Sequence, residues 1–268
     1  MYEFNSQSAI TPHLLVSVEN YALRAASMVR AMLKNGYDVQ TKKDENDLVT
    51  SIDFAVNNFL REQLYERKPL FGWVSEESKD NAMEEFTWVV DPIDGTSNMV
   101  KHNREFAISI GLVKNGVPIL GVVIHPTIGK HGTMISGAIG LGLYVNKQEV
   151  IPQYRLSNQR VILSHDIVMS RSVKTVLPQI PMGSIAWRLA NIAIGNGDIT
   201  LGWYPKGNLW DIAAGHALIL VSGGLVTDKN NNAINYTNAN NTANGLVATG
   251  NKENHDLACR LQNTKGNI

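Results

Sequence analysis

The segment Asp91–Ser97 constrains this chain more than any other. It follows an apolar run, Phe86–Val90, which predicts a buried strand. Pro92 disfavours helix at the residue before it and cannot donate to a sheet ladder, so we expect the strand to end at Asp91. Two carboxylates, those of Asp91 and Asp94, are then placed at the carboxyl end of a strand with a rigid bend between them.

The residues after these two acids add groups of a different kind. Gly95, Thr96 and Ser97 offer a flexible backbone, free N–H groups and two hydroxyls. Hard divalent cations bind carboxylate and carbonyl oxygens, and phosphate binds N–H groups at a turn or at the start of a helix. The segment therefore predicts a metal site beside a phosphate site. The alternative is a plain strand–turn–helix with an acid in the bend and a hydroxyl cap.

Composition narrows the function classes. The chain has 268 residues, 44% of them hydrophobic, and shows neither an internal repeat nor a long linker, so we expect a single domain over residues 1–268. Because Lys+Arg and Asp+Glu both number 24, no global basic field favours a nucleic-acid polymer or an anionic membrane. We find no signal-peptide pattern and no apolar run of the ~18 residues that a membrane helix needs. The single cysteine, Cys259, excludes an internal disulfide and fits a cytoplasmic protein.

Two amphipathic helices are predicted near the N-terminus. Thr11 is the expected cap of the first, which would begin at Pro12 and end at Asn35. Ser51 is the expected cap of the second and places Asp53 in its first turn. Asp53 is then either a functional acid or one that only complements the helix dipole.

Further acids follow other predicted elements. Ser75 and Glu76 follow a short apolar strand over 69–74, so neighbouring strand ends would bring Glu76 near Asp91 and Asp94. A turn containing Asn-Gly joins strands over 107–113 and 117–124, and another strand is expected over 199–204. Asp211 lies in the first turn of a helix that is almost wholly apolar through Val221. A buried carboxylate needs a partner, which is either the helix N-terminus or a cation.

Taken together, these acids indicate phosphate chemistry. Four or five converging carboxylates cannot all be ionised without cations. Because no His or Cys accompanies them, the cation should be hard: Mg²⁺, or Mn²⁺ as a substitute. Carboxylate-held Mg²⁺ usually meets substrate phosphate, and two such ions can clamp the attacking and leaving oxygens of an in-line displacement.

The chain resembles the inositol monophosphatase family, within the superfamily of lithium-sensitive, magnesium-dependent phosphatases. The resemblance spans nearly the whole chain and is carried by Asp47–Asp53, Glu76–Ser78, Trp88–Asn98, Trp210–Gly215 and Gly223–Gly224. It implies an αβαβα sandwich of the inositol monophosphatase and fructose-1,6-bisphosphatase type. It also implies a homodimer and inhibition by lithium.

The resemblance further implies roles for single residues. The first metal would be held by Glu76, Asp91 and the Ile93 carbonyl, the second by Asp91, Asp94 and Asp211, and a third, weaker ion would lie near Glu76. Asp53 and Thr96 would position and deprotonate a metal-bound water. The backbone of Gly95 and Thr96, with the hydroxyl of Thr96 or Ser97, would bind the phosphate. The helix that begins at Ser184 would contact the leaving group.

The resemblance is incomplete in the segment before Asp211, which we expect to determine substrate specificity. Family members acting on inositol phosphates place a Glu seven residues before the last metal-binding Asp, and here that position is Tyr204. The run Trp203-Tyr204-Pro205-Lys206 instead resembles the branch that hydrolyses 3′-phosphoadenosine 5′-phosphate. Lys206 would then meet a second phosphate, unless it is only a solvated turn lysine.

Three functions therefore stay open. The first is Mg²⁺-dependent hydrolysis of an inositol monophosphate or a related polyol or sugar phosphate. The second is the same chemistry on a nucleotide or sugar bisphosphate. The third is a non-catalytic metal-binding or regulatory protein, against which the intact set of acids argues.

Overall fold

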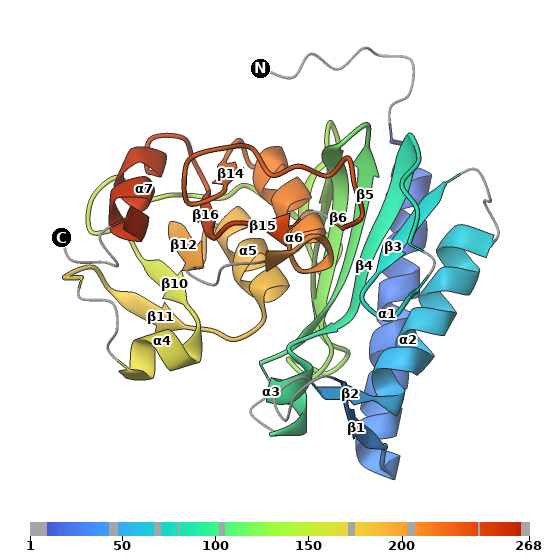
Figure 1. The fold of residues 1–268 in the computed structure, drawn as a ribbon. Coiled ribbons are helices and arrows are strands. Elements are labelled where there is room, and N and C mark those ends of the chain that lie inside the picture. The colour runs from blue at the N-terminus through green and yellow to red at the C-terminus, as the bar shows by residue number, and fades with distance from the viewer. Residues whose placement is uncertain are drawn as a thin grey trace.

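The computed structural model describes residues 10–42, 48–66, 71–79, 81–101, 105–170, 175–202, 207–240 and 242–263. Helices and sheets alternate in five layers (Figure 1). A pair of helices covers one face of a seven-stranded sheet, two more helices fill the space between that sheet and a five-stranded sheet, and a last pair covers the outer face of the smaller sheet. The predicted αβαβα sandwich is confirmed.

The larger sheet has the order β3-β4-β5-β6-β7-β8-β9. Its strands are β3 (Gly72–Ser75), β4 (Phe86–Asp94), β5 (Ala107–Lys114), β6 (Val117–His125), β7 (Thr133–Ala138), β8 (Gly142–Val145) and β9 (Gln148–Val150). Only β3 and β4 pair in parallel; the other neighbours in this sheet are antiparallel. The predicted hairpin is β5–β6, and its turn residues Asn115 and Gly116 both have positive φ, at 48° and 80°, as a tight two-residue hairpin turn requires.

The prediction that the strand ends at Asp91 is wrong. β4 continues through Pro92 to Asp94. Its register against β5 shifts by one residue between the pairs Asp91–Ser109 and Asp94–Ala107. A strand can accommodate proline at such a β-bulge, because the extra residue makes no hydrogen bond to the neighbouring strand and the missing N–H of Pro92 therefore breaks none. Asp91 and Asp94 are the paired residues on either side of this irregularity.

The outer pair of helices consists of α1 (Pro12–Asn35) and α2 (Ser51–Arg61), which continues as the π-helical turn η2 (Glu62–Glu66). Thr11 caps α1 as predicted, since its hydroxyl accepts from the Leu14 N–H at 3.2 Å. The cap predicted for α2 is wrong by one residue: Thr50 is the N-cap, and Ser51 is the first helical residue. Thr50 belongs to a small hairpin of β1 (Val39–Thr41) and β2 (Leu48–Thr50).

The middle layer contains α5 (Ile185–Ala193) and α6 (Leu209–Val221). α6 lies on the sheet at two glycines: a Cβ at Gly121 would be 2.1 Å from the Ala214 carbonyl oxygen, and one at Gly111 would be 2.9 Å from the Ala214 nitrogen. Only glycine permits this approach. The close packing fixes the start of α6, and with it Asp211, relative to the large sheet.

The smaller sheet has the order β11-β10-β12-β16-β14. Its strands are β10 (Val161–Leu163), β11 (Gln179–Pro181), β12 (Ile199–Gly202), β14 (Leu225–Thr227) and β16 (Leu246–Thr249). The helices outside it are α4 (His165–Ser170) and α7 (His255–Asn263), and β13 (Gly207–Asn208) pairs with β15 (Thr242–Ala243) beside α6. The strand predicted over 199–204 ends at Gly202 in the structure, and the rest of that prediction lies outside the described residues.

Candidate active site

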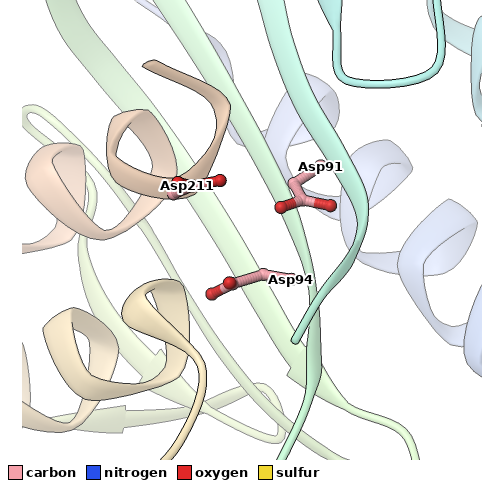
Figure 2. A group of neighbouring side chains, drawn as sticks. All are labelled: Asp91, Asp94 and Asp211. Atoms are coloured by element: carbon pink, nitrogen blue, oxygen red, sulfur yellow. The ribbon is translucent and has the colours of Figure 1, made fainter. Parts of the chain in front are cut away.

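Three aspartates meet where the large sheet and the middle helices adjoin. Asp91 and Asp94 lie at the end of β4, and Asp211 lies in the first turn of α6. One carboxylate oxygen from each lies within 4.8 Å of the other two (Figure 2). The sequence placed these acids at element ends, and the structure brings them together.

Burial sets the electrostatics of this group. Asp91 is 1% exposed and Asp94 is 8% exposed. Burial, with the nearby acid charges, raises the pKa of Asp91 and of Asp211 well above the ordinary value. Burial also raises the pKa of Asp94 to about 6, against the opposing effect of hydrogen bonds from Ser184 and Ala186. Three acids this close favour a proton or a cation between them.

Each aspartate is oriented by a hydrogen bond from the protein. Asp91 Oδ1 accepts from the Ile93 N–H at 2.9 Å, and Asp211 Oδ2 accepts from the Asn208 N–H at 3.2 Å. Asp94 Oδ2 accepts from the Ser184 hydroxyl and from the Ala186 N–H, both at 2.6 Å. Ser184 was predicted to face the substrate. In the structure its hydroxyl is directed to Asp94 and its side chain also caps α5.

This donor set fits a hard divalent cation. The oxygens are close enough to share an ion, and the buried negative charge requires compensation. Oxygen-only ligands of this kind suit hard cations rather than soft ones. Among the described residues, no other trio of acidic, histidine or cysteine side chains converges in this way.

Glu76 lies beside this group but outside it. Ser75 pairs with Val90 across the parallel β3–β4 ladder, which brings Glu76 next to the end of β4, as predicted. Its Oε1 is 2.9 Å from Lys42 Nζ, and that same ammonium is 2.5 Å from Glu77 Oε1. Burial opposes the charge on Lys42, but the two carboxylates more than offset this and raise its pKa.

Asp53, at the start of α2, is the centre of a second polar cluster. Its Oδ2 accepts from the Thr50 N–H at 2.9 Å and from the Thr50 hydroxyl at 2.5 Å, and its Oδ1 accepts from the Thr96 hydroxyl at 2.8 Å. Thr96 Oγ1 also lies 3.0 Å from the Ile93 carbonyl oxygen. Burial raises the pKa of Asp53, and the bonds from Thr50 and Thr96 oppose that rise. The structure therefore brings the predicted pair Asp53–Thr96 into contact, with Thr50 as a third member.

The turn after β4 forms the floor of a cavity. Gly95 has φ 98°, and a Cβ there would be 2.7 Å from the Glu105 carbonyl oxygen, so no other residue fits. It precedes the short helix α3 (Thr96–Val100). The cavity has a volume of about 250 Å³. It is lined by Glu76, Asp91, Ile93, Asp94, Gly95, Thr96, Ser97 and Asp211, and also by Leu48, Asn98 and Asn208.

Two residues that contact predicted site residues were not themselves predicted. Thr50 contacts Asp53, but the sequence favoured its neighbour Ser51 as the helix cap. Lys42 contacts Glu76, which lies 34 residues further along the chain. Tyr204 and Lys206, which carry the substrate prediction, lie outside the described residues.

Comparison with known proteins identifies the lineage. A profile of the inositol monophosphatase family matches residues 11–266. The chain belongs to the inositol monophosphatase family. It is accordingly an enzyme that hydrolyses phosphate monoesters.

Individual relatives agree on the family and differ in substrate. An inositol-1-monophosphatase of Bacillus subtilis is 31% identical over 76% of this chain and 80% of its own length. A 3'(2'),5'-bisphosphate nucleotidase CysQ of Buchnera aphidicola is 31% identical over 73% of this chain and 76% of its own. In fold, the chain is similar to an IMPase from Thermotoga maritima, with a TM-score of 0.80 at 23% identity, covering 95% of this chain and 98% of that one. Within the described residues, no helix is both long and apolar enough to cross a membrane.

Proposed function

We propose that this protein hydrolyses a small phosphate monoester, an inositol monophosphate or a related polyol or sugar phosphate, with two or three Mg²⁺ ions held at the acid cluster. Mn²⁺ is the expected substitute. The observation that carries the proposal is the convergence of Asp91, Asp94 and Asp211 beside the Asp53–Thr96 pair. Thr96 links the two groups along the chain, because it lines the same cavity as the three aspartates and donates to Asp53.

The metal ligands divide as the family resemblance implies. Glu76, Asp91 and the Ile93 carbonyl would hold one ion, and Asp91, Asp94 and Asp211 a second. Bound ions of this kind lower the pKa of the attacking water and neutralise the charge that develops on the leaving oxygen.

The chain itself supplies the base and the phosphate contacts. Asp53 accepts the proton of the attacking water through Thr96, whose hydroxyl donates to Asp53 Oδ1 and so leaves its lone pairs for the water. A raised pKa makes Asp53 a stronger base than an exposed carboxylate. Gly95, Thr96 and Ser97 line the cavity at the start of α3. The N–H groups of Gly95 and Thr96, with the hydroxyl of Thr96 or Ser97, are the proposed phosphate contacts.

One experiment tests the chemistry. In Asp91→Asn, phosphate release from inositol 1-phosphate should fall by at least ~100-fold, because the residue that both ions share loses its charge. The assay compares wild type and variant across an Mg²⁺ titration with EDTA blanks. Turnover that persists in the variant, or in wild type under EDTA, would contradict the metal mechanism.

A second candidate substrate class is favoured by the segment 203–206 and by the similarity to the Buchnera nucleotidase. A panel of inositol 1-phosphate, fructose 1,6-bisphosphate and 3′-phosphoadenosine 5′-phosphate separates the two classes through kcat/KM. For Lys206→Ala we expect weaker binding of the bisphosphates and little change for the monophosphate. Equal losses on both would refute contact with a second phosphate.

Three further properties are proposed: a homodimer, a cytoplasmic location and inhibition by lithium. We infer a homodimer, which analytical ultracentrifugation of the full chain tests. A cytoplasmic location is consistent with the free thiol of Cys259. Lithium inhibition would act by competition for the ion site of Asp94 and Asp211, and it should therefore strengthen as the Mg²⁺ concentration falls.

A further inference from the structure

A second cavity lies beside α1, at a distance from the acid cluster. It is enclosed by α1, the loop between β6 and β7 and the turn between β8 and β9, and its volume is about 320 Å³. Two strands, β5 and β6, separate β7 from β4, and the described residues that line this cavity all differ from those that line the candidate active site. We call it the α1 cavity. Its lining includes Leu23, Lys130, His131, Met134, Asn146 and Lys147.

Hydrogen bonds between elements hold the walls of the α1 cavity. Arg30 of α1 donates through Nη1 to the carbonyl oxygens of Pro126 and His131, at 3.0 and 2.9 Å, and so ties the β6–β7 loop to the helix. On the other side, Asn146 Oδ1 accepts from the Met134 N–H at 2.9 Å and ties the β8–β9 turn to β7. The cavity is therefore formed by the protein alone, as pockets for small molecules usually are.

Lys147 occupies a backbone position that favours glycine. It is the second residue of the two-residue turn between β8 and β9, and both turn residues, Asn146 and Lys147, have positive φ, at 49° and 68°. Glycine is preferred there because a side chain is strained at such angles. The Lys147 ammonium is held 2.8 Å from Asn20 Oδ1 of α1, so the turn and the helix are joined beside the cavity. An unfavourable backbone position of this kind suggests a function for the side chain.

Positive charge surrounds the α1 cavity without acidic partners. Lys130, His131 and Lys147 line it, and all three residues are exposed. Among the residues that the structure describes, none of these three forms an ion pair with a carboxylate. An acid of α1, Glu19, is buried, and its Oε1 accepts from the Ser136 hydroxyl at 2.6 Å. The two lysines therefore leave uncompensated positive charge at this cavity.

The cavity also offers apolar surface. Leu23 lines it from α1, and Met134, which is 1% exposed, lines it from β7. Lysine side chains extend this surface, because their methylene stems lie along apolar groups while the ammonium groups stay in water. We propose that the α1 cavity binds a small organic anion, whose apolar body contacts Leu23 and Met134 and whose anionic group meets the ammonium groups of Lys130 and Lys147. This site is independent of the proposed metal site.

The experiment measures binding of phenylphosphonate to the full-length protein by ligand-observed NMR, in EDTA and at low ionic strength. Phenylphosphonate joins an aromatic ring to a dianion and has no ester bond to hydrolyse. Without metal, the acid cluster repels anions, and low salt preserves the attraction of exposed lysines. We expect saturable binding that is at least about 5-fold tighter than that of inorganic phosphate or benzyl alcohol, because each of these supplies only one half of the ligand. Equal binding of either one would overturn the proposal.

Two variants and a control locate the binding. Lys130→Ala and Lys147→Gly should each weaken phenylphosphonate binding by at least about 5-fold. Lys147→Gly removes the ammonium and suits the positive φ of the turn, so its free energy of unfolding in urea should not fall. Lys252→Ala is the control, because Lys252 is exposed on the segment before α7, a helix that packs against the smaller sheet. No binding to wild type, unchanged binding in both variants, or an equal loss in the control would overturn the proposal.

Discussion

At the scale of single residues, the site depends on how Asp53 is held. Its carboxylate would lose both orientation and charge without donors, because it is 1% exposed. Thr50 supplies two of the three donors through the N-cap of α2, and Thr96 supplies the third. One short capping motif therefore ends a strand, starts a helix and orients the proposed base. The acid in the first turn does more than complement the helix dipole.

Replacing Thr50 by Val tests whether the cap of α2 also controls the pKa of Asp53. The change removes the hydroxyl that donates to Asp53 and keeps the N–H, so the pKa of Asp53 should rise further. We expect kcat/KM at neutral pH to fall by about 10-fold and the acidic limb of its pH profile to move to higher pH. Thr50→Ser keeps the hydroxyl and should restore both. A lower rate with an unmoved pH profile would mean that Thr50 acts only as a helix cap, worth about 1 kcal/mol.

At the scale of elements, the packing of α6 on the large sheet decides where Asp211 lies. The helix crosses β5 and β6 at Gly111 and Gly121, and on its other side Gly215 meets Leu189 of α5, where a Cβ would be 2.3 Å from the Leu189 Cβ. These glycines let α6 approach both the large sheet and its neighbour α5 closely. A helix held further out would carry Asp211 away from Asp91 and Asp94.

Gly121→Ala should therefore damage both stability and metal binding. A Cβ there would be 2.1 Å from the Ala214 carbonyl oxygen, so the helix must move. We expect a loss of about 1–3 kcal/mol in the free energy of unfolding and weaker Mg²⁺ binding by calorimetry. The control is Gly140→Ala, which has φ 83° and no atom within 4 Å of the added carbon. It should cost about 1 kcal/mol from backbone strain and leave Mg²⁺ affinity alone. Unchanged Mg²⁺ affinity in Gly121→Ala would mean that the packing of α6 on the large sheet does not determine metal binding.

The same elements show which features of the fold and site could be predicted from the sequence. The Asn115–Gly116 turn and the Thr11 cap were predictable because their chemistry is local. The bulge at Pro92 was not, because only the pairing of β4 with β5 shows that no ladder N–H is missing. Lys42 lies in a charged loop and meets Glu76 only after β1 and β2 pair. The meeting of the acids was predicted from strand ends and family resemblance, whereas the role of Ser184 depends on how α5 sits against β4.

At the scale of the whole molecule, the net charge is zero although negative charge is concentrated at the three aspartates. The chain carries 24 basic and 24 acidic residues. Yet the folded state gathers Asp91, Asp94 and Asp211 where burial raises the pKa of each. The ionised form of these aspartates is therefore less favourable in the folded state than in the unfolded state. Gathering them lowers the free energy of unfolding and leaves negative charge that a bound cation could compensate. Large apolar cores lie on both faces of the large sheet, and the apolar burial there opposes the cost of gathering these charges.

This trade predicts a pH-dependent stability in the absence of metal. The pKa of Asp94 is about 6 in the folded protein and 3.8 as the ordinary value, so between these values the folded state binds more protons than the unfolded state. Its contribution therefore falls as pH rises from about 4 to above 6, and stays lost at neutral pH. Asp94→Asn removes the titration while keeping an oxygen for Ser184 and Ala186. In EDTA at pH 7.5 we expect the variant to be more stable than wild type by about 1–3 kcal/mol in urea unfolding. That gap should shrink toward pH 4, and Mg²⁺ should stabilise wild type more than the variant. A gap that does not change with pH would mean that the charge of Asp94 is already compensated in the metal-free protein.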